Sequence, residues 1–503
     1  MSRATTIKLL AAITSLIVAG CAVGPDFHRP AAPDVKGYTP QPLVKQTATA
    51  NTAGGQAQQF LEGQDIPGQW WTLFHSESLN ALVGKALNAN PDLAAAQAAL
   101  RQAQENVYAA EGTLFPSVNA DGSGARQKNS GAQFGNPKNP GSLFTLYNAS
   151  VNVSYGLDIF GLARRALESI EAQAEFQRYQ LEAAYLTLTS NVVTTAVQEA
   201  SLRGQIAAIQ EIVKVEAEQL DVLQQQFDTG AIARTNVLAQ QVTLAQTKAN
   251  LPPLERQLAL IRNQLTALAG EFPSQDLGVT VDLASLQLPQ ELPVSLPSRL
   301  VEQRPDIRAA EAQLHQASAQ IGVATANMLP QFTLSGSIGS VATKVGDLFT
   351  SGTGVWSLGA NLAQPLFRGG TLTHQRRAAV ASYDEAAAKY RSTVLAAFQN
   401  VADALRALQS DADALRAQSM AAQAASDSLN IAREQYKNGA ISYLSLLNAQ
   451  QAYQQTRVSL VQAQANRYAD TAALFQALGG GWWHRNDAVP SSAATHKPED
   501  VRQ

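Results

Sequence analysis

The chain has 503 residues, of which 45% are hydrophobic, 15% charged and only 6% aromatic, and its formal net charge is −3. This nearly balanced charge argues against a nucleic-acid-binding protein, which would need a basic surface. A single cysteine excludes disulfide bonds within the chain and metal sites built from several cysteines. The length allows two or three ordinary domains, but few aromatic residues and abundant Ala and Gln favour close-packed helices over one large globular core.

The first twenty residues have the pattern of a secretory signal. Arg3 and Lys8 precede an apolar stretch, residues 9–18, that is too short to span a bilayer. Removal of residues 1–20 takes away two basic residues and no acidic one, so the net charge moves from −3 to −5.

The signal ends in Val18-Ala19-Gly20-Cys21, which resembles a bacterial lipobox. In a lipobox the cysteine is diacylated and becomes the first residue of the mature chain. The alternative is an ordinary signal peptide with an incidental cysteine. Acyl chains on Cys21 would anchor the protein with roughly 0.8 kcal/mol per buried CH₂. Ala22 follows, and by resemblance to sorted lipoproteins this residue favours the outer membrane.

Residues 22–68 are rich in Pro, Gly, Gln and Thr and have little periodicity, which predicts an extended or irregular tether. Helical spacing of apolar residues begins at Leu79. Asn90-Pro91-Asp92-Leu93 then restarts a helix, because Pro at the first position and Asp in the first turn suit the unpaired amides there. We expect this helix to run to about Leu114, before Pro116.

The pattern then changes to strands. Apolar and polar residues alternate over residues 148–159, 332–338 and 356–362, and more weakly over the Gly-rich residues 117–126. Each segment approaches the roughly ten residues that a tilted membrane strand needs. Two ordinary hairpins, each with one face packed on a helix, are the alternative.

The context of the four strands favours a membrane barrel. The connecting segments, residues 127–147 and 343–355, are long, polar and Gly-rich, as on the outer side of a barrel. No run of 18 apolar residues follows the signal, so a membrane crossing would have to be a β-barrel. Four strands cannot close a barrel, and open edges cannot lie in lipid, so several chains would share one barrel.

Two very long helices are expected. Apolar residues from Leu202 to Phe227 recur alternately four and three apart, which is a coiled-coil seam. No Pro interrupts Gly161 to Gly230, so roughly 68 residues could form one helix about 100 Å long. A second unbroken segment, Gly370 to Lys437, ends in a similar glycine turn.

The two halves of the chain align with each other. Asn90-Pro91-Asp92-Leu93 matches Arg304-Pro305-Asp306-Ile307, and Phe115-Pro116 matches Leu329-Pro330. Each half reads helix, strand, strand, long helix, glycine turn, helix. This order indicates a duplicated unit.

These stretches resemble the outer membrane factors, the TolC-like or NodT-type lipoprotein channels of efflux systems. Six stretches carry the resemblance and together extend over nearly the whole chain: residues 21–27, 70–74, 296–298, 304–311, 364–370 and 477–482. The resemblance implies a mixed α and β membrane protein with duplicated halves. Three chains would each give four strands to a twelve-stranded outer-membrane barrel, continued by a long α-helical coiled-coil barrel in the periplasm.

On this basis the chain divides into six parts. They are the signal peptide, 1–20; an acylated tether that joins an equatorial region, 21–78; the first repeat, 79–270; an equatorial linker, 271–297; the second repeat, 298–479; and a C-terminal tail, 480–503. The expected location is the outer membrane, with a lipid anchor and an extension into the periplasm.

The resemblance also implies partners at the glycine turns. Gly230-Ala231 and Gly439-Ala440 would contact a periplasmic adaptor, which joins an inner-membrane pump of the RND type. Independently, both glycines are expected to end helices at a position that needs positive φ. Asp228, Arg234, Arg433 and Lys437 lie beside the turns and are candidates for ion pairs that close a gate, although solvated helix ends are the simpler interpretation.

No enzyme signature is present. The six histidines are scattered without the spacing of metal ligands, and no Ser lies in a Gly-x-Ser-x-Gly motif. We therefore predict no catalytic residues, no metal and no cofactor besides the lipid on Cys21. The predicted function is a passive export duct for small molecules. The alternatives are the outlet of a type I protein secretion system and a periplasmic coiled-coil scaffold.

Overall fold

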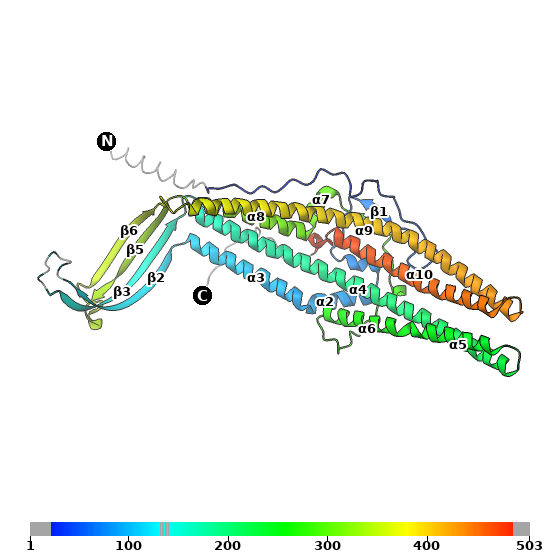
Figure 1. Ribbon diagram of the computed structural model, residues 1–503. Helices are drawn as coiled ribbons and strands as arrows, with labels where there is room; N and C mark the ends of the chain where they lie inside the picture. Colours follow the sequence, from blue (N-terminus) through cyan, green and yellow to red (C-terminus); the bar gives the residue numbers. More distant parts are fainter. Residues whose placement is uncertain (1–21, 131, 133–134, 136–137, 139, 486–503) are drawn as a thin grey trace. The chain divides into compact units, whose positions relative to one another are not determined.

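The computed structural model describes residues 22–130, 132, 135, 138 and 140–485. Cys21 and the rest of the signal lie outside them, as does His496. The described helices and strands follow in chain order (Figure 1): β1 Gln59–Glu62, α2 Glu77–Ala89, α3 Pro91–Glu111, β2 Ser117–Asn129, β3 Ser142–Leu157, α4 Leu162–Asp228, α5 Arg234–Ala249, α6 Leu251–Leu268, β4 Glu291–Val294, α7 Pro297–Gln303, α8 Pro305–Ala326, β5 Gln331–Ala342, β6 Gly354–Ala363, α9 Thr371–Lys437 and α10 Tyr443–Ala477.

The chain forms two compact units, each made of three stretches. The described part of the first unit comprises residues 22–30, 99–177 and 310–390, and that of the second comprises 31–98, 178–309 and 391–485. Each unit therefore combines parts of both sequence repeats.

The four predicted strands form one antiparallel sheet in the first unit, in the order β2-β3-β5-β6. All four strands are longer than the predicted alternation. β2 continues to Asn129, β3 already begins at Ser142, β5 covers Gln331–Ala342 and β6 covers Gly354–Ala363. The expected loop at 127–147 is thus too long. Gly and charged residues obscure the alternation in this part of the sequence, whereas the ladder pairs Asn129 with Ser142 directly.

The long helices α4 and α9 confirm the predicted rods, at 67 residues each. The helix that returns from the first turn is broken into α5 and α6, whereas its counterpart α10 is continuous. Pro252 and Pro253 explain the break, because neither can donate the backbone hydrogen bond that a continuous helix requires. The prediction of a single returning helix in the first repeat is therefore wrong.

The helix starts follow from capping residues. The Oδ1 atom of Asn90 accepts hydrogen bonds from the amides of Asp92 and Leu93, at 3.0 and 3.1 Å, and so caps α3. Ser76 caps α2 in the same way by accepting from the amide of Leu79. The helix predicted to reach Leu114 is an α-helix only as far as Glu111. A short 3₁₀ turn then covers Gly112–Leu114.

The N-terminal segment is irregular as predicted, but it is not a loose tether. In the second unit β1 pairs in parallel with β4, which the sequence does not predict. The fully buried guanidinium of Arg467 donates to the carbonyl oxygen of Gly54 at 2.7 Å and to Oε1 of Gln58 at 3.0 Å. These contacts hold residues 47–62 against α10 and the linker.

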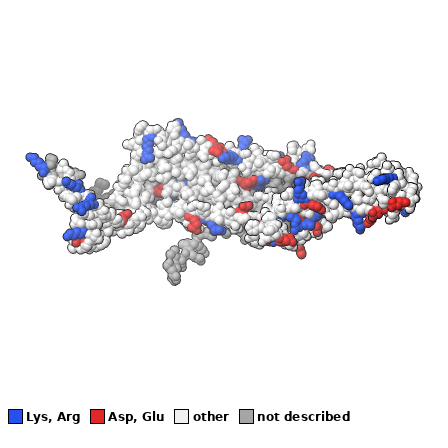
Figure 2. Space-filling view, turned by 60° about the horizontal axis from the view of Figure 1, so that its bottom comes forward, with Lys and Arg blue, Asp and Glu red and all other residues white. Residues whose placement is uncertain are grey.

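The main core of the second unit includes Trp70 and Phe74, at the 3₁₀ turn before α2, both almost completely buried. Phe475 of α10 packs on Trp70, with ring centroids 5.5 Å apart. No helix in the described part of the chain is both long and apolar enough to cross a bilayer. On the face shown in Figure 2, charged side chains are interspersed among a majority of uncharged ones.

Candidate functional site

The sheet of the first unit has one apolar and one polar face. In the antiparallel ladders Val151 lies opposite Ile338, which lies opposite Trp356, so these side chains share a face. Ile338 is 67% exposed, Trp356 75% and Leu358 81%. A face of large apolar side chains open to the surroundings is typical of contact with lipid or with another protein.

The opposite face carries small polar side chains that bond to one another across strands. The Nδ2 atom of Asn152 donates to Oδ2 of Asp121 at 2.6 Å, and the hydroxyls of Ser337 and Ser357 lie 2.9 Å apart. This face is suited to water. The sheet therefore has one face suited to an apolar environment and one suited to water.

The two glycine turns lie in the second unit and have nearly the same geometry. Gly230 and Gly439 adopt φ of 76° and 73°, as predicted for the residue that follows a helix. The amide of Gly230 donates to Phe227 O at 2.9 Å, and that of Ala231 to Gln226 O at 2.8 Å.

Gly439 and Ala440 repeat both bonds at the same distances, to Tyr436 O and Gln435 O. Each turn is thus a Schellman motif, in which two otherwise unpaired carbonyls are satisfied. A Cβ atom at either glycine would meet nothing within 4 Å, so only backbone conformation requires glycine here.

The four candidate gate charges surround these turns. Asp228, Arg234 and Lys437 are exposed and Arg433 is half-buried. Asp228 accepts a hydrogen bond from Gln224 at 2.9 Å. Within the single chain, among the residues that the structure describes, none of the four forms an ion pair. The two hairpins of a single chain therefore make none of the predicted inter-hairpin ion pairs, and pairs between hairpins of different copies stay a prediction.

The two hairpins of one chain pack together behind their turns. Leu223 and Val237 of the first hairpin share a buried cluster with Leu429 and Leu446 of the second. The phenol of Tyr443 in α10 donates to Oε1 of Gln240 in α5 inside this region. Both side chains are buried, so the hydrogen bond joins the hairpins where water does not compete.

Gln240 also links back to α4. Its Nε2 atom donates to the backbone carbonyl of Glu216 at 2.9 Å. Burial raises the pKa of the Glu216 carboxyl, while a hydrogen bond with Thr247 lowers it. The Glu216 Oε2 atom is buried and has no hydrogen-bond partner among the described residues. The sequence does not predict this network, because nothing in its pattern distinguishes Tyr443, Gln240 or Glu216 from other helix residues.

A second titratable group lies further along the helices. The pKa of Asp411 is raised to about 7, mainly because the carboxyl is buried and also because it forms a hydrogen bond with the Asp470 carboxyl. The positive charge of Arg467 opposes this rise. No group of three or more His, Cys, Asp or Glu side chains in the described part of the chain is placed to hold a metal ion.

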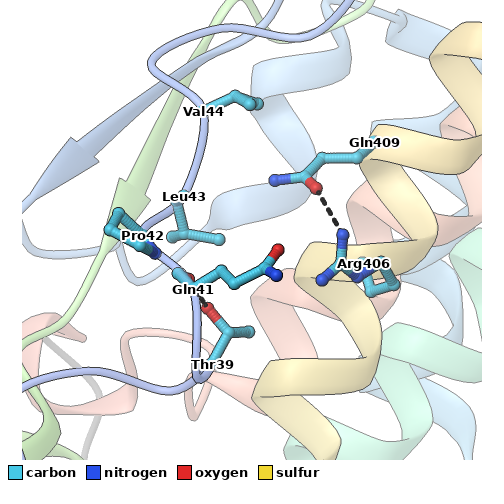
Figure 3. Close-up of a pocket in the computed structure, with 7 residues that line it drawn as sticks. All are labelled: Thr39, Gln41, Pro42, Leu43, Val44, Arg406 and Gln409. Carbon is cyan, nitrogen blue, oxygen red and sulfur yellow. Dashed lines mark hydrogen bonds between the residues drawn. The ribbon is translucent and has the colours of Figure 1, made fainter.

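A small surface pocket lies between the N-terminal segment and α9 (Figure 3). Leu43 and Gln41 line it on one side and Arg406 on the other, where Arg406 Nη1 donates to Oε1 of Gln409 at 3.3 Å. The pocket contains no titratable side chain besides this arginine. It shows that residues 39–44 lie along α9.

Comparison with known proteins identifies the family. A model of the outer membrane efflux protein family matches residues 82–271 and 296–480. The pyoverdine export outer membrane protein OpmQ of Pseudomonas aeruginosa is 32% identical over 458 residues, which are 89% of this chain and 94% of OpmQ. The toluene efflux pump outer membrane protein TtgC of Pseudomonas putida is 28% identical over 97% of this chain and 98% of TtgC.

The solved structure of the outer-membrane channel OprN is also similar. It superimposes with a TM-score of 0.81 at 27% identity, covering 92% of this chain and 100% of the OprN chain. The sheet with one apolar and one polar face, the two long helices and the duplicated order all fit this likeness. The chain therefore belongs to the outer membrane efflux protein family, and it is an outer-membrane efflux channel.

Proposed function

We propose that this channel is a passive export duct made of three copies of the chain. Each copy gives four strands to one twelve-stranded barrel, and the helical hairpins extend into the periplasm. The observation that carries the proposal is the sheet itself. In the described chain β2 and β6 each pair on one edge only, while the apolar face is open. Unpaired strand edges are costly in lipid, which favours pairing with β6 and β2 of other copies.

The turns at Gly230-Ala231 and Gly439-Ala440 meet a periplasmic adaptor, and the adaptor connects the duct to an inner-membrane pump of the RND type. Two exposed turns of the same geometry, one at the end of each long helix, support this assignment. One relative is named for toluene efflux and another for pyoverdine export. These names support small molecules as cargo. The energy for export comes from the pump, since the duct performs no chemistry.

The remaining parts of the proposal concern the anchor and the gate. Cys21, outside the described residues, carries the acyl chains that anchor each copy in the outer membrane. Asp228, Arg234, Arg433 and Lys437 form ion pairs between copies that help to keep the periplasmic end closed. Their positions beside the exposed turns support this role.

Light scattering of the protein extracted from outer membranes in mild detergent tests the shared barrel. With the detergent mass subtracted, the expected polypeptide mass is that of three chains. A single chain recovered from the soluble fraction would overturn the proposal and favour a periplasmic scaffold. Stepwise conductance of the three-chain species in planar bilayers is the expected second result.

A further inference from the structure

The strands β2, β3, β5 and β6, which the structure describes completely, contain three charged residues. Asp121 of β2 lies on the polar face, where it accepts a hydrogen bond from Asn152. Arg126 and Lys128 follow five and seven residues further along β2, so they lie on the opposite, apolar face. We call these two residues the cation pair. They are the only charged side chains on the apolar face of these four strands.

The cation pair has no acidic neighbour. The antiparallel ladder places Thr145 opposite Arg126 and Leu143 opposite Lys128. Both cations are exposed, and neither forms an ion pair with any residue that the structure describes. Two exposed cations that no carboxylate neutralises attract an anion from the surroundings.

The cation pair lies just beyond the apolar part of the sheet. We call the end at which β2 connects to β3, and β5 to β6, the outer end. On β3 the apolar face runs from Leu157 to Tyr147, ten residues nearer to the outer end. At about 3.4 Å per residue and a tilt of about 40°, this stretch covers a height of about 25 Å, which matches the apolar band of a membrane barrel.

Tyr147 marks the outer edge of this band, as aromatic residues do at membrane interfaces. The residue opposite Tyr147 is Gly124, and Arg126 follows two residues further on. The cation pair therefore begins about 7 Å along the strand beyond the apolar band, at the level of lipid head groups. Figure 2 shows basic side chains gathered at the outer end of the sheet.

The loop between β5 and β6 folds back over the apolar face at the outer end. Ser340 lies on this face, since it follows Ile338 by two residues, and it is almost completely buried. Its Oγ atom accepts a hydrogen bond from the amide of Phe349 at 3.0 Å and donates to Oγ1 of Thr353 at 2.8 Å. These two bonds hold the loop against the sheet.

This loop turns apolar side chains to the surroundings. Phe349 is 76% exposed, and its φ of 67° is a conformation that bulky residues rarely adopt. Val345 in the same loop is also exposed. Only β3 separates β5 from β2, so the loop and the cation pair are about 10 Å apart across the sheet. Cations and apolar side chains are thus close enough to contact one lipid.

We propose that the cation pair and the loop of Phe349 bind lipopolysaccharide, the phosphorylated glycolipid of the outer leaflet. Arg126 and Lys128 bind the phosphates of its lipid A part, and Phe349 and Val345 contact its acyl chains. The site fixes the height of the sheet in the outer membrane. This inference rests on the proposed function, because hairpins in the periplasm place the outer end of the sheet in the outer leaflet.

Phosphate suits the chemistry of the cation pair. The guanidinium of Arg126 can donate two parallel hydrogen bonds to phosphate oxygens, and Lys128 adds a point charge. The two residues are about 7 Å apart on one face of a strand, so they can contact one phosphate together or two phosphates of one head group. A cation on the lipid face costs little free energy near the interface, whereas it is costly at the middle of the bilayer.

An exchange of neighbouring residues tests whether the face of the sheet matters. In the swap variant, Arg126→Gln with Gln127→Arg and Lys128→Asn with Asn129→Lys move both cations to the opposite face. Composition and net charge stay those of the wild type. The removal variant, Arg126→Gln with Lys128→Asn, lacks both cations.

Native mass spectrometry of the full-length protein in mild detergent measures the binding of purified lipid A. The wild type is expected to bind lipid A about tenfold more tightly than lipid A without its phosphates, and both variants should lose this preference. Equal binding of the two lipids by the wild type, or an unchanged preference in the swap variant, would overturn the phosphate site. Displacement of lipid A by excess inorganic phosphate would overturn the assignment to a lipid.

Phe349→Asn tests the apolar part of the site. Asn tolerates positive φ better than Phe, so the variant removes the apolar side chain without weakening the loop. Lipid A should bind several-fold more weakly, whereas Phe272→Asn, at an equally exposed phenylalanine of the second unit, should not change binding. Equal binding in these two variants would refute the role of the loop.

The same spectra separate this inference from the proposed function. They report the polypeptide mass of each particle together with the lipid bound to it. A mass of one chain in the wild type would refute the shared barrel. A mass of three chains, with lipid A bound equally by the wild type and the swap variant, would refute the lipid site alone.

Discussion

The hydroxyl of Tyr443 in α10 donates a hydrogen bond to the side-chain carbonyl of Gln240 in α5, and this buried contact joins the two hairpins of one chain. Gln240 in turn donates to the backbone of Glu216 in α4. Three helices that end or begin near the two turns are therefore held in one relative position. Movement of one hairpin away from the other must break these bonds.

Tyr443→Phe is expected to loosen the hairpins without changing the shape of the cluster. It leaves Gln240 Oε1 buried without its donor, at a cost of about 1–3 kcal/mol. Hydrogen exchange should be faster in residues 236–247 and 443–450. Tyr453→Phe, at a tyrosine that packs against the same cluster, is the control. Equal exchange in the two variants would show that the hydrogen bond does not hold the hairpins.

Asp411 should make stability depend on pH. Its pKa is raised to about 7 in the folded chain, first by burial and then by the Asp470 carboxyl, from 3.8 for an ordinary Asp. The folded state therefore binds more protons between about pH 4 and pH 8, so the free energy of unfolding falls as pH rises through this range. The pH dependence tests the assignment of the raised pKa to this carboxyl.

In Asp411→Asn the fall between about pH 4 and pH 8 should be smaller than in the wild type, as measured by thermal unfolding midpoints. Asp413→Asn is a close control, because Asp413 is exposed on the same helix and pairs with Arg416. An unaltered pH profile in Asp411→Asn would contradict the prediction.

Glycine substitutions should separate backbone strain from steric exclusion. Gly230→Ala forces a non-glycine residue to φ 76° in open space, at a cost of about 1–2 kcal/mol. Gly481→Ala adds to a similar strain a Cβ placed 2.4 Å from the carbonyl oxygen of Ile66 and 2.6 Å from that of Pro67, so its total cost should reach about 2–5 kcal/mol. Urea unfolding followed by circular dichroism measures both. Gly230→Asn should be milder than Gly230→Ala, because Asn tolerates positive φ.

The two faces of the sheet should respond differently to charge. Leu358→Arg places a guanidinium on the apolar face, which costs about 2–4 kcal/mol at the middle of a bilayer. The amount of channel recovered from outer-membrane fractions should fall. Ser357→Arg alters the neighbouring residue on the polar face and should leave the recovery nearly unchanged. Similar losses in both variants would contradict contact between the apolar face and lipid.

Reversal of a charge beside the second turn tests the gate. Lys437→Glu should loosen the closed end and raise the leak conductance in planar bilayers, because ion pairs between copies would be replaced by repulsion. Lys214→Glu, an exposed site on α4 away from the turn, is the control. Conductance equal to that of the wild type in Lys437→Glu would argue against a gating role for this residue.

The features that the sequence predicted well are the ones with local causes. A long apolar period without Pro specifies α4 and α9, and the need for positive φ marks Gly230 and Gly439. Alternation marks the four strands of the large sheet. The break between α5 and α6 also has a local signal, Pro252 and Pro253. The likeness to the second repeat nevertheless favoured one continuous helix.

Only the tertiary structure decided which distant residues meet. The pairing of β1 with β4, the Tyr443 bond to Gln240 and the hydrogen bond from Arg165 to Asp26 join segments whose separate sequences carry no mark of each other. Local periodicity reflects the backbone geometry of one element, and this was enough to determine a duplicated chain of helices and strands. The buried contacts depend on how these elements pack, and packing selects partners by shape and hydrogen bonding that no single stretch of sequence records.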